Sequence, residues 1–257
     1  MGSGAQNHPG PEALSREWDA LVLLLTWVAG SVDAISYLGL GHVFTANMTG
    51  NTVLLGLALG QRQGLAALRS MIALAGFAGG AAMGALIVGG GPKQEGWPPG
   101  VTRAVLVEGI ILVIFTITWH IPAGAQSARL IYVLIALSAL AMGIQSTAIR
   151  HLNVPGVATT YITGTLTSMV AGLVGWVGSA DLLVAAARLE GSRVTRAPAD
   201  PRKKQTIRLQ AAVFLVYGLA AVASGIVETR VSSLVSLSLL AAIAIVVIFA
   251  SLRHRHH

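Results

Sequence analysis

The chain has 257 residues but no cysteine, and only 11% of its residues are Asp, Glu, Lys or Arg. The absence of cysteine excludes a small scaffold that is held together by disulfide bonds. The low charge sets the chain apart from soluble domains, in which about 25% of residues are charged. Hydrophobic residues make up 54% of the sequence, more than a soluble core of this length can bury, and this also excludes intrinsic disorder. The composition therefore predicts a polytopic membrane protein.

Six apolar stretches are long enough to cross a bilayer, which takes about 20 residues of helix. They lie near Asp19–Gly41, Leu65–Gly90, Val101–Ile121, Leu130–Ile149, Ile207–Val227 and Val231–Leu252. Two further segments, near Phe44–Gly60 and Tyr161–Leu183, open with a polar Thr/Gly cluster and become apolar afterwards. The predicted fold is an all-α polytopic membrane protein with six long transmembrane helices plus two interrupted or short helices, which are crossings, half-helices or re-entrant segments.

The distribution of basic residues predicts the orientation. If both interrupted segments cross, the chain has eight crossings, and 13 of its 17 Lys and Arg residues lie on the side of the termini. Because positively charged loops stay cytoplasmic, we expect a protein of the cytoplasmic (inner) membrane with both termini in the cytoplasm. Six crossings plus two re-entrant segments would move Arg62 and Arg69 to the other side, so we favour eight crossings.

The loop over residues 188–206 is the most basic part of the chain. We expect the run from Arg188 to Arg208 to lie near anionic lipid headgroups on the cytoplasmic side. No nucleic-acid-binding motif accompanies it, so a nucleic-acid partner is not expected.

An internal repeat is visible when the chain is shifted by 114 residues, because Val43–Gly50 then aligns with Val157–Gly164. The predicted organisation is a cytoplasmic N-terminal tail (1–18), a first membrane repeat (19–121), a connecting loop (122–129), a second membrane repeat (130–252) and a C-terminal tail (253–257). Interrupted helices in corresponding positions of two repeats are typical of transporters, whose substrate site lies at the repeat interface.

Asp33 lies inside the first predicted span, where a carboxylate costs about 2.5–3.5 kcal/mol even on insertion scales. We interpret it as a carboxylate that binds a coupling proton or a cation. The alternative is an acid that bonds backbone ends exposed by the nearby helix break. Glu108, in a later span, is a second acid of this kind and a second candidate for coupling.

The residues that follow Asp33 are the first candidate contacts for a solute: Tyr37, Thr45, Asn47, Thr49, Gly50 and Asn51. Gly50 allows the backbone to bend or to approach a neighbour closely. Thr49 or Asn51 is predicted to cap the short helix, whose positive end would then favour a polar or anionic ligand. Capping without any ligand is the alternative.

The second repeat offers a matching set of candidates without a titratable group: Gln145, Thr159, Thr160, Thr163, Gly164 and Thr165. Gln145 stands where the first repeat has Asp33. Its alternative role is to hold helices together by hydrogen bonds. In the third span, Gly76, Gly80 and Gly84 are spaced four apart, which predicts close helix packing within the chain.

The stretch from Gly30 to Asn51 and the stretch from Ala141 to Thr165 resemble the YoaK-like family of bacterial integral membrane proteins. The resemblance covers nearly the whole chain, from about residue 18 to residue 252. It implies a membrane protein whose domain is of unknown function and usually has about six spans. It supplies no substrate, and its span count supports the six-plus-two alternative.

The first functional hypothesis is a secondary transporter or permease for a small polar or ionic solute, with its site at the two Thr-Gly helix breaks. A channel is a close variant. The chain lacks G-x-S-x-G, H-E-x-x-H and P-loop motifs, so we do not expect an enzyme, a metal or a cofactor. The alternatives are an intramembrane enzyme that uses Asp33 and Glu108, and a non-catalytic membrane scaffold. A homo-oligomer is compatible with each hypothesis.

Overall fold

The computed structural model describes residues 11–89, 97–120, 128–152, 158–160, 162–174, 201–228 and 232–254. Helices fill most of these ranges, and the ranges contain no strand. The helices are α1 (Pro11–Gly39), α2 (Met48–Gly60), α3 (Gly64–Val88), α4 (Pro99–Trp119), α5 (Ala128–His151), a helix over Ile162–Val174, α7 (Pro201–Glu228) and α8 (Ser232–His254). Outside the described residues lie most of the predicted tails, most of loop 122–129, Tyr161 and most of loop 188–206.

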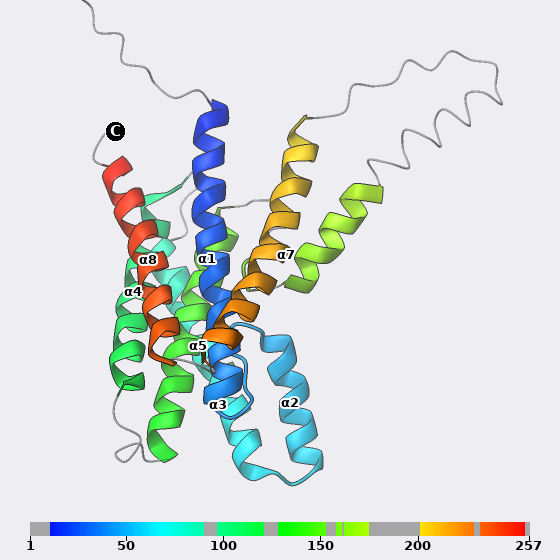
Figure 1. Ribbon diagram of the computed structural model, residues 1–257, viewed down its shortest axis with the longest axis vertical. Coiled ribbons are helices and arrows are strands. Elements are labelled where there is room, and N and C mark those ends of the chain that lie inside the picture. The colour runs from blue at the N-terminus through cyan, green and yellow to red at the C-terminus, as the bar shows by residue number, and fades with distance from the viewer. Residues whose placement is uncertain are drawn as a thin grey trace, which may run out of the picture.

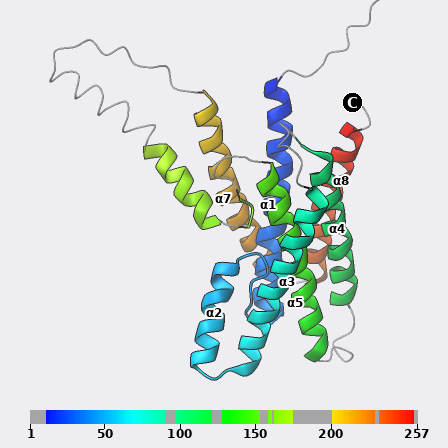
Figure 2. The same ribbon diagram turned by 180° about the vertical axis from the view of Figure 1, so that it is seen from behind.

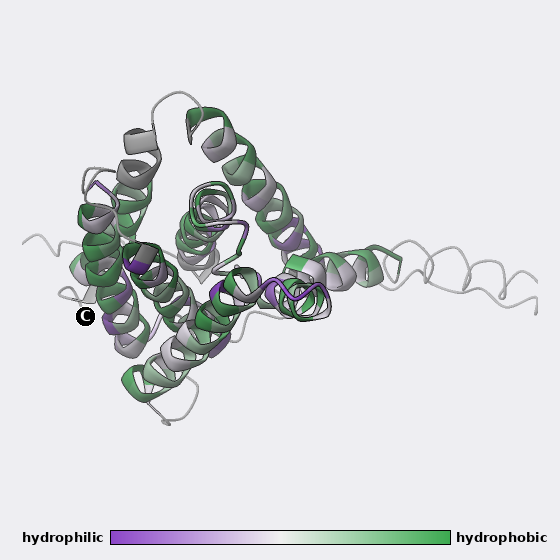
Figure 3. Ribbon diagram, turned by 90° about the horizontal axis from the view of Figure 1, so that it is seen from below, coloured by the Kyte–Doolittle hydropathy of each residue, from purple (hydrophilic) through white to green (hydrophobic). Residues whose placement is uncertain are grey.

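Among the described residues, five helices are long and apolar enough to cross a membrane: α1, α3, α4, α5 and α7. Three apolar stretches are shorter, namely Met48–Gly60, Ile162–Val174 and the Leu239–Leu252 part of α8. Large apolar side chains such as Leu86 (84% exposed) cover the outer surface. Such a surface is unfavourable in water but suits contact with lipid tails. Apolar colouring dominates the helices in Figure 3. The prediction of an all-α polytopic membrane protein is confirmed.

The two short helices do not run the length of the bundle. In Figure 1, α1 descends through the bundle, the chain turns back upward, and α2 begins above the lower end of α1 and descends again beside α3. The Ile162–Val174 helix likewise begins at mid-height after α5 has risen. This course resembles the six-plus-two alternative, and the number of membrane crossings stays a prediction.

The charge argument for eight crossings does not discriminate between the two topologies. With six crossings, Arg62 and Arg69 do move to the opposite side. Arg129 moves there too, whereas Lys93, Arg103 and Arg150 move to the basic side, so that 13 of the 17 cations again share one side. The start of α1 and the end of α8 lie at the same end of the bundle, as both topologies require (Figure 1).

The centre of the bundle is α1, because 67% of its spanning window is buried, against 17% for α3. It packs against α7, α8 and α5. The α3–α5 pair forms the most extensive contact in the described chain, and the two helices lie side by side from behind (Figure 2). A Cβ on Gly80 would lie 2.0 Å from the Leu140 carbonyl oxygen, and one on Gly84 would lie 3.0 Å from Thr147. The predicted role of the Gly76–Gly80–Gly84 row in packing within the chain is confirmed.

Candidate functional site

The chain reverses direction at the end of α1. Gly41 and His42 both have positive φ, at 85° and 63°, and the residues up to Asn47 then run back along the helix. The helix α2 starts at Met48, with the side chain of Asn47 accepting a hydrogen bond from the Gly50 amide at 3.2 Å. The short helix α2 therefore begins beside α1 rather than beyond its end. The prediction that Thr49 or Asn51 caps α2 is wrong, because Asn47 takes this role.

Asp33 joins α1 to this break. Its Oδ1 accepts hydrogen bonds from three consecutive backbone amides, those of Thr45 at 2.8 Å, Ala46 at 2.7 Å and Asn47 at 3.3 Å. Its Oδ2 accepts a hydrogen bond from the hydroxyl of Tyr217 on α7. Only 3% of Asp33 is exposed. The carboxylate thus supplies acceptors for amides that the helix break would leave unpaired inside the bundle.

Two further side chains fix the break. Asn51 is fully buried, accepts a hydrogen bond from the Phe44 amide at 2.9 Å and donates one to the Phe44 carbonyl. The Thr45 and Ser36 hydroxyls share a hydrogen bond at 2.9 Å. A Cβ on Gly50 would lie 2.9 Å from the Phe44 ring, which confirms the predicted close approach at this glycine. Asn51 and Thr45 are therefore structural in this arrangement, and no solute is needed to satisfy them.

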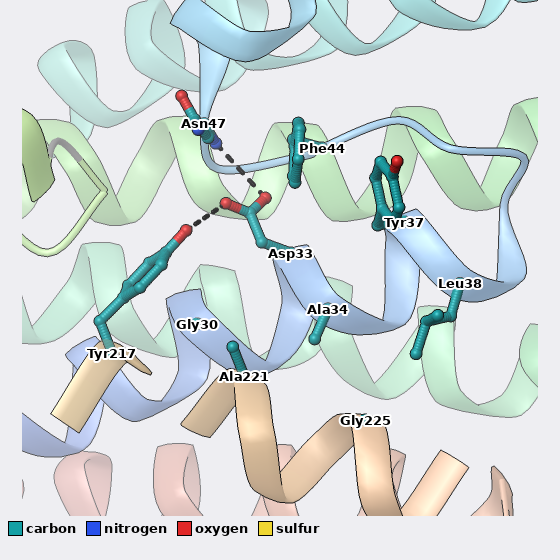
Figure 4. Close-up of a pocket in the computed structure, with 10 residues that line it drawn as sticks. All are labelled: Gly30, Asp33, Ala34, Tyr37, Leu38, Phe44, Asn47, Tyr217, Ala221 and Gly225. Atoms are coloured by element: carbon teal, nitrogen blue, oxygen red, sulfur yellow. Dashed lines mark hydrogen bonds between the residues drawn. The ribbon is translucent and has the colours of Figure 1, made fainter. Parts of the chain in front are cut away.

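A pocket of about 340 Å³ lies between α1, the break and α7. Figure 4 shows Asp33 at its centre, with Asn47 on one side and the Tyr217 hydroxyl on the other. The lining residues are Gly30, Asp33, Ala34, Tyr37, Leu38, Phe44, Asn47, Tyr217, Ala221 and Gly225. Their small members let α1 and α7 approach closely: a Cβ on Gly30 would lie 2.5 Å from the Tyr217 carbonyl oxygen. The volume falls in the range of natural small-molecule sites, about 300–1,000 Å³.

The Asp33–Tyr217 pair can take up one proton without moving a heavy atom. As drawn, the phenol donates to Oδ2. If Oδ2 is protonated, the carboxyl becomes the donor and the phenol oxygen accepts, because a hydroxyl can do both. The phenol keeps its hydrogen, which no longer bonds to Oδ2 and can turn toward the pocket that Tyr217 lines. The three amides on Oδ1 keep their acceptor in both states.

The second break repeats part of this hydrogen bonding. The Gln145 amide group donates to the Thr159 hydroxyl and to the Leu25 carbonyl on α1, both at 2.9 Å. The Thr165 hydroxyl accepts from the Ala158 amide at 3.2 Å and donates to its carbonyl at 3.3 Å. Thr159 and Thr165 stand 114 residues after Thr45 and Asn51, at the shift seen in the sequence. The contacts match locally, whereas a repeat over the whole chain stays a prediction.

The pocket at Asp33 is lined by the first break and not by the described residues of the second. Among the described residues, the predicted second cluster of Gln145, Thr159, Thr160, Thr163, Gly164 and Thr165 contributes nothing to the lining of the pocket at Asp33. The first break bonds to α1 at Asp33, whereas Gln145 of α5, the partner of Thr159 at the second break, bonds to α1 at Leu25, about 12 Å away along the helix axis. Thr160 donates to Ser146 at 3.0 Å, and both Thr49 and Thr163 are exposed. Of the predicted residues, Asp33, Tyr37 and Asn47 line the pocket.

Glu108 lies elsewhere, fully buried on α4. Neither of its carboxyl oxygens has a hydrogen-bond partner among the described residues. The helix α4 packs mainly against α3, α5 and α8, and it meets α1 where the Trp119 ring lies against Gly39. Glu108 is not among the residues that line the pocket at Asp33. Asp33 and Glu108 therefore do not share the pocket, and the coupling role of Glu108 stays a prediction. The described residues contain no group of three or more His, Asp or Glu side chains that could hold a metal.

Sequence reasoning missed Tyr217, the residue of α7 that completes the pocket. A signal was present: it is one of only four tyrosines, and it lies within a long apolar span. A phenol hydroxyl buried in a bundle needs a hydrogen-bond partner. A tyrosine and an aspartate in two different spans are therefore candidates for a hydrogen bond to each other. The sequence alone does not show that α1 and α7 are neighbours.

Comparison with known proteins agrees with the assignment as a membrane protein. A family model described as a protein of unknown function (DUF1275) matches residues 21–252. The chain is 44% identical over 154 residues to the UPF0700 transmembrane protein YoaK of Bacillus subtilis (strain 168). That alignment covers 59% of this chain and 65% of the relative, so it spans slightly less than two thirds of the relative's length. No solved structure matches the chain.

Proposed function

The chain belongs to the DUF1275 family of membrane proteins, and from that premise we propose that it is a secondary transporter for a small polar or ionic solute. The solute binds in the pocket at the first helix break, and Asp33 carries the coupling proton. The single observation that supports this most is the buried carboxylate at a helix break that opens on a pocket of about 340 Å³. Transporters characteristically place their sites at such discontinuous helices.

The matching hydrogen bonds at the second break add to the support. The loop before α2 bonds to Asp33 on α1, and Gln145 of α5 bonds both to Thr159 at the second break and to Leu25 on α1, so the same central helix has a polar link to each break. Alternating access needs parts of the bundle that move against one another around the site. We propose that the break after α1 moves relative to α7, because Asp33 bonds the amides of the break through Oδ1 and the Tyr217 hydroxyl of α7 through Oδ2, and so connects the two.

The proposal extends to the location of the protein. The excess of Lys and Arg residues on one side supports a location in the cytoplasmic membrane, with both termini and the basic run from Arg188 to Arg208 facing the cytoplasm. There the basic run contacts anionic lipid headgroups. The charge count favours this orientation whether the chain crosses six or eight times.

A flux assay with purified protein in liposomes tests the function. Liposomes that are acidic inside and loaded with a pH-sensitive dye receive a panel of small cations, anions and neutral solutes, one at a time. At least one solute is expected to accelerate proton exit from wild-type liposomes and not from liposomes with Asp33→Asn. Glu108→Gln is the matched control, because it also removes a buried carboxylate but lies outside the pocket.

The result would count against the transporter if no solute moved protons in the wild type. It would also count against the proposed site if Asp33→Asn kept the full response. Loss of the response in Glu108→Gln alone would shift the coupling role to α4. An intramembrane enzyme that pairs the two acids gains no support, since Glu108 does not line the pocket at Asp33 and its carboxyl oxygens have no hydrogen-bond partner among the described residues.

A further inference from the structure

We infer that the solute of the Asp33 pocket is a small organic cation, an amine or ammonium compound with a short apolar body. This inference rests on the proposed function and names its substrate class. Three features of the pocket carry it: the charge of its lining, the nature of its walls and the way its carboxylate is bonded.

The lining has one formal charge, that of Asp33. The other nine lining residues are neutral, and none is Lys, Arg or His. An anionic solute would meet an uncompensated carboxylate in a site of low dielectric, where repulsion is strong. The amides just before α2, those of Thr45, Ala46 and Asn47, do not offset this repulsion, because they already bond to Oδ1 of Asp33, and the Gly50 amide of α2 bonds to the Asn47 side chain. The electrostatics therefore favour a cation.

The walls separate organic cations from metal ions. Six of the ten lining residues have no polar side-chain atom: Gly30, Ala34, Leu38, Phe44, Ala221 and Gly225. Ions such as Ca²⁺ require about six to eight oxygen ligands, which these walls do not provide. The rings of Tyr37 and Phe44 stack at 5.1 Å between centroids, and aromatic rings attract ammonium groups. A cation with an apolar body fits both parts of the lining.

Exposure gives the solute a direction. Asp33 is 3% exposed, whereas Tyr37 and Leu38, about one turn further along α1, are 37% and 50% exposed. The charged head of the solute therefore lies at the inner end beside Oδ2, and its apolar body lies toward Leu38. At Oδ2 the head meets the Tyr217 hydroxyl, which can turn and accept a hydrogen bond from an ammonium N–H.

The same oxygen explains the coupling. Oδ1 of Asp33 is occupied by three amides, so Oδ2 is where a proton or an ammonium group can be bound. The two cations compete for this one oxygen. Binding of the ammonium group therefore releases the proton, and the transport cycle exchanges an organic cation for a proton.

A matched series of probes tests the charge requirement. The probes are n-butylammonium, n-butanol and butyrate, which share a short apolar chain and differ in the charge of the head. Their effects on the melting temperature of the purified full-length protein are measured in detergent at constant ionic strength, because a ligand of the native state raises that temperature. Butylammonium is expected to stabilise the wild type in a concentration-dependent way, with butanol and butyrate at least about tenfold weaker.

Two variants and one control separate charge from shape. Asp33→Asn keeps an oxygen acceptor for the three amides but removes the charge, and it is expected to weaken butylammonium binding by at least about tenfold. Ala34→Leu leaves Asp33 in place and fills the pocket, so it is expected to abolish the response as well. Glu108→Gln is expected to bind as the wild type does, since Glu108 does not line the pocket.

Equal or stronger stabilisation by butanol or butyrate, an unchanged response in Asp33→Asn, or no stabilisation by butylammonium would overturn the inference. The liposome assay separates this failure from failure of the proposed function. Asp33-dependent proton movement driven by a neutral or anionic solute would keep the transporter and reject the cation. Charge-selective binding without any flux would keep the cation site and reject transport.

Discussion

The two helix breaks are held by different side chains at corresponding positions, Asp33 at the first break and Gln145 at the second. At the first break, a carboxylate on α1 accepts from three amides of the following segment, and its second oxygen borders a pocket. At the second, Gln145 on α5 donates to Thr159 and Leu25, and its Oε1 has no partner among the described residues. One break thus holds a titratable group at a cavity, and the other holds a neutral amide in a packed interior.

The same type of helix break can therefore be stabilised either by a neutral side chain or by a titratable one. Both breaks need side chains that satisfy backbone groups inside a membrane bundle. An amide group does this at lower cost than a carboxylate, which is expensive in the bilayer. Asp33 is therefore the more costly solution to a problem that Gln145 solves with a neutral group, and the pocket beside Asp33 is the compensating gain. Four experiments test this difference between the two breaks.

The largest expected effect is the loss of the acceptor at the first break. Asp33→Leu leaves three amides and the Tyr217 hydroxyl without their partner, at about 1–3 kcal/mol for each buried donor that finds no replacement. We expect a destabilisation on the order of 4 kcal/mol, against about 1 kcal/mol for Gln145→Leu. Unfolding by SDS from mixed micelles measures both. Equal losses at the two positions would remove the asymmetry.

The next effect compares the two side chains that hold the loops. Asn51→Leu removes both hydrogen bonds to Phe44 at a fully buried position, and we expect a loss of about 2–3 kcal/mol. Thr165→Val removes the hydroxyl contacts to Ala158, which are longer, and we expect about 1 kcal/mol. The same unfolding titration compares them. A larger loss at Thr165 than at Asn51 would contradict the ranking.

A smaller effect is expected at the link between α1 and α7. Tyr217→Phe removes one hydrogen bond between helices, worth about 0.6–1.7 kcal/mol in a membrane protein. A double-mutant cycle with Asp33→Leu, which removes both carboxyl oxygens, measures the coupling, because partners in contact give non-additive changes. Additive changes would mean that the two side chains do not interact in the folded protein.

The sequence predicts the helices and the positions of both breaks, because apolar runs, glycines and small polar residues determine these locally. It also identifies Asp33, since an acid inside an apolar span is costly wherever the span packs. It fails on what depends on packing. The cap at Asn47 depends on how the chain reverses after Gly41, and the role of Tyr217 depends on α1 and α7 being neighbours across 184 residues.

The predicted convergence of both Thr-Gly clusters on one site stays a prediction, because among the described residues only the first cluster lines the pocket at Asp33. A pattern that recurs in the sequence predicts similar local contacts, and these occur at Thr45 and Thr159. It does not say where each break meets α1. Gln145 meets α1 at Leu25, two turns away from Asp33, and neither Gln145 nor Thr159 lines the pocket at Asp33.

The most direct test of the claim that only the first break carries the titratable site is proton release on binding. The purified protein in weakly buffered detergent solution is mixed with n-butylammonium, and a pH-indicator dye reports the protons released. The wild type and Gln145→Leu are expected to release protons at a pH where Asp33 is partly protonated, and Asp33→Asn is expected to release none. Release that persists in Asp33→Asn, or that disappears in a folded Gln145→Leu variant, would contradict the account.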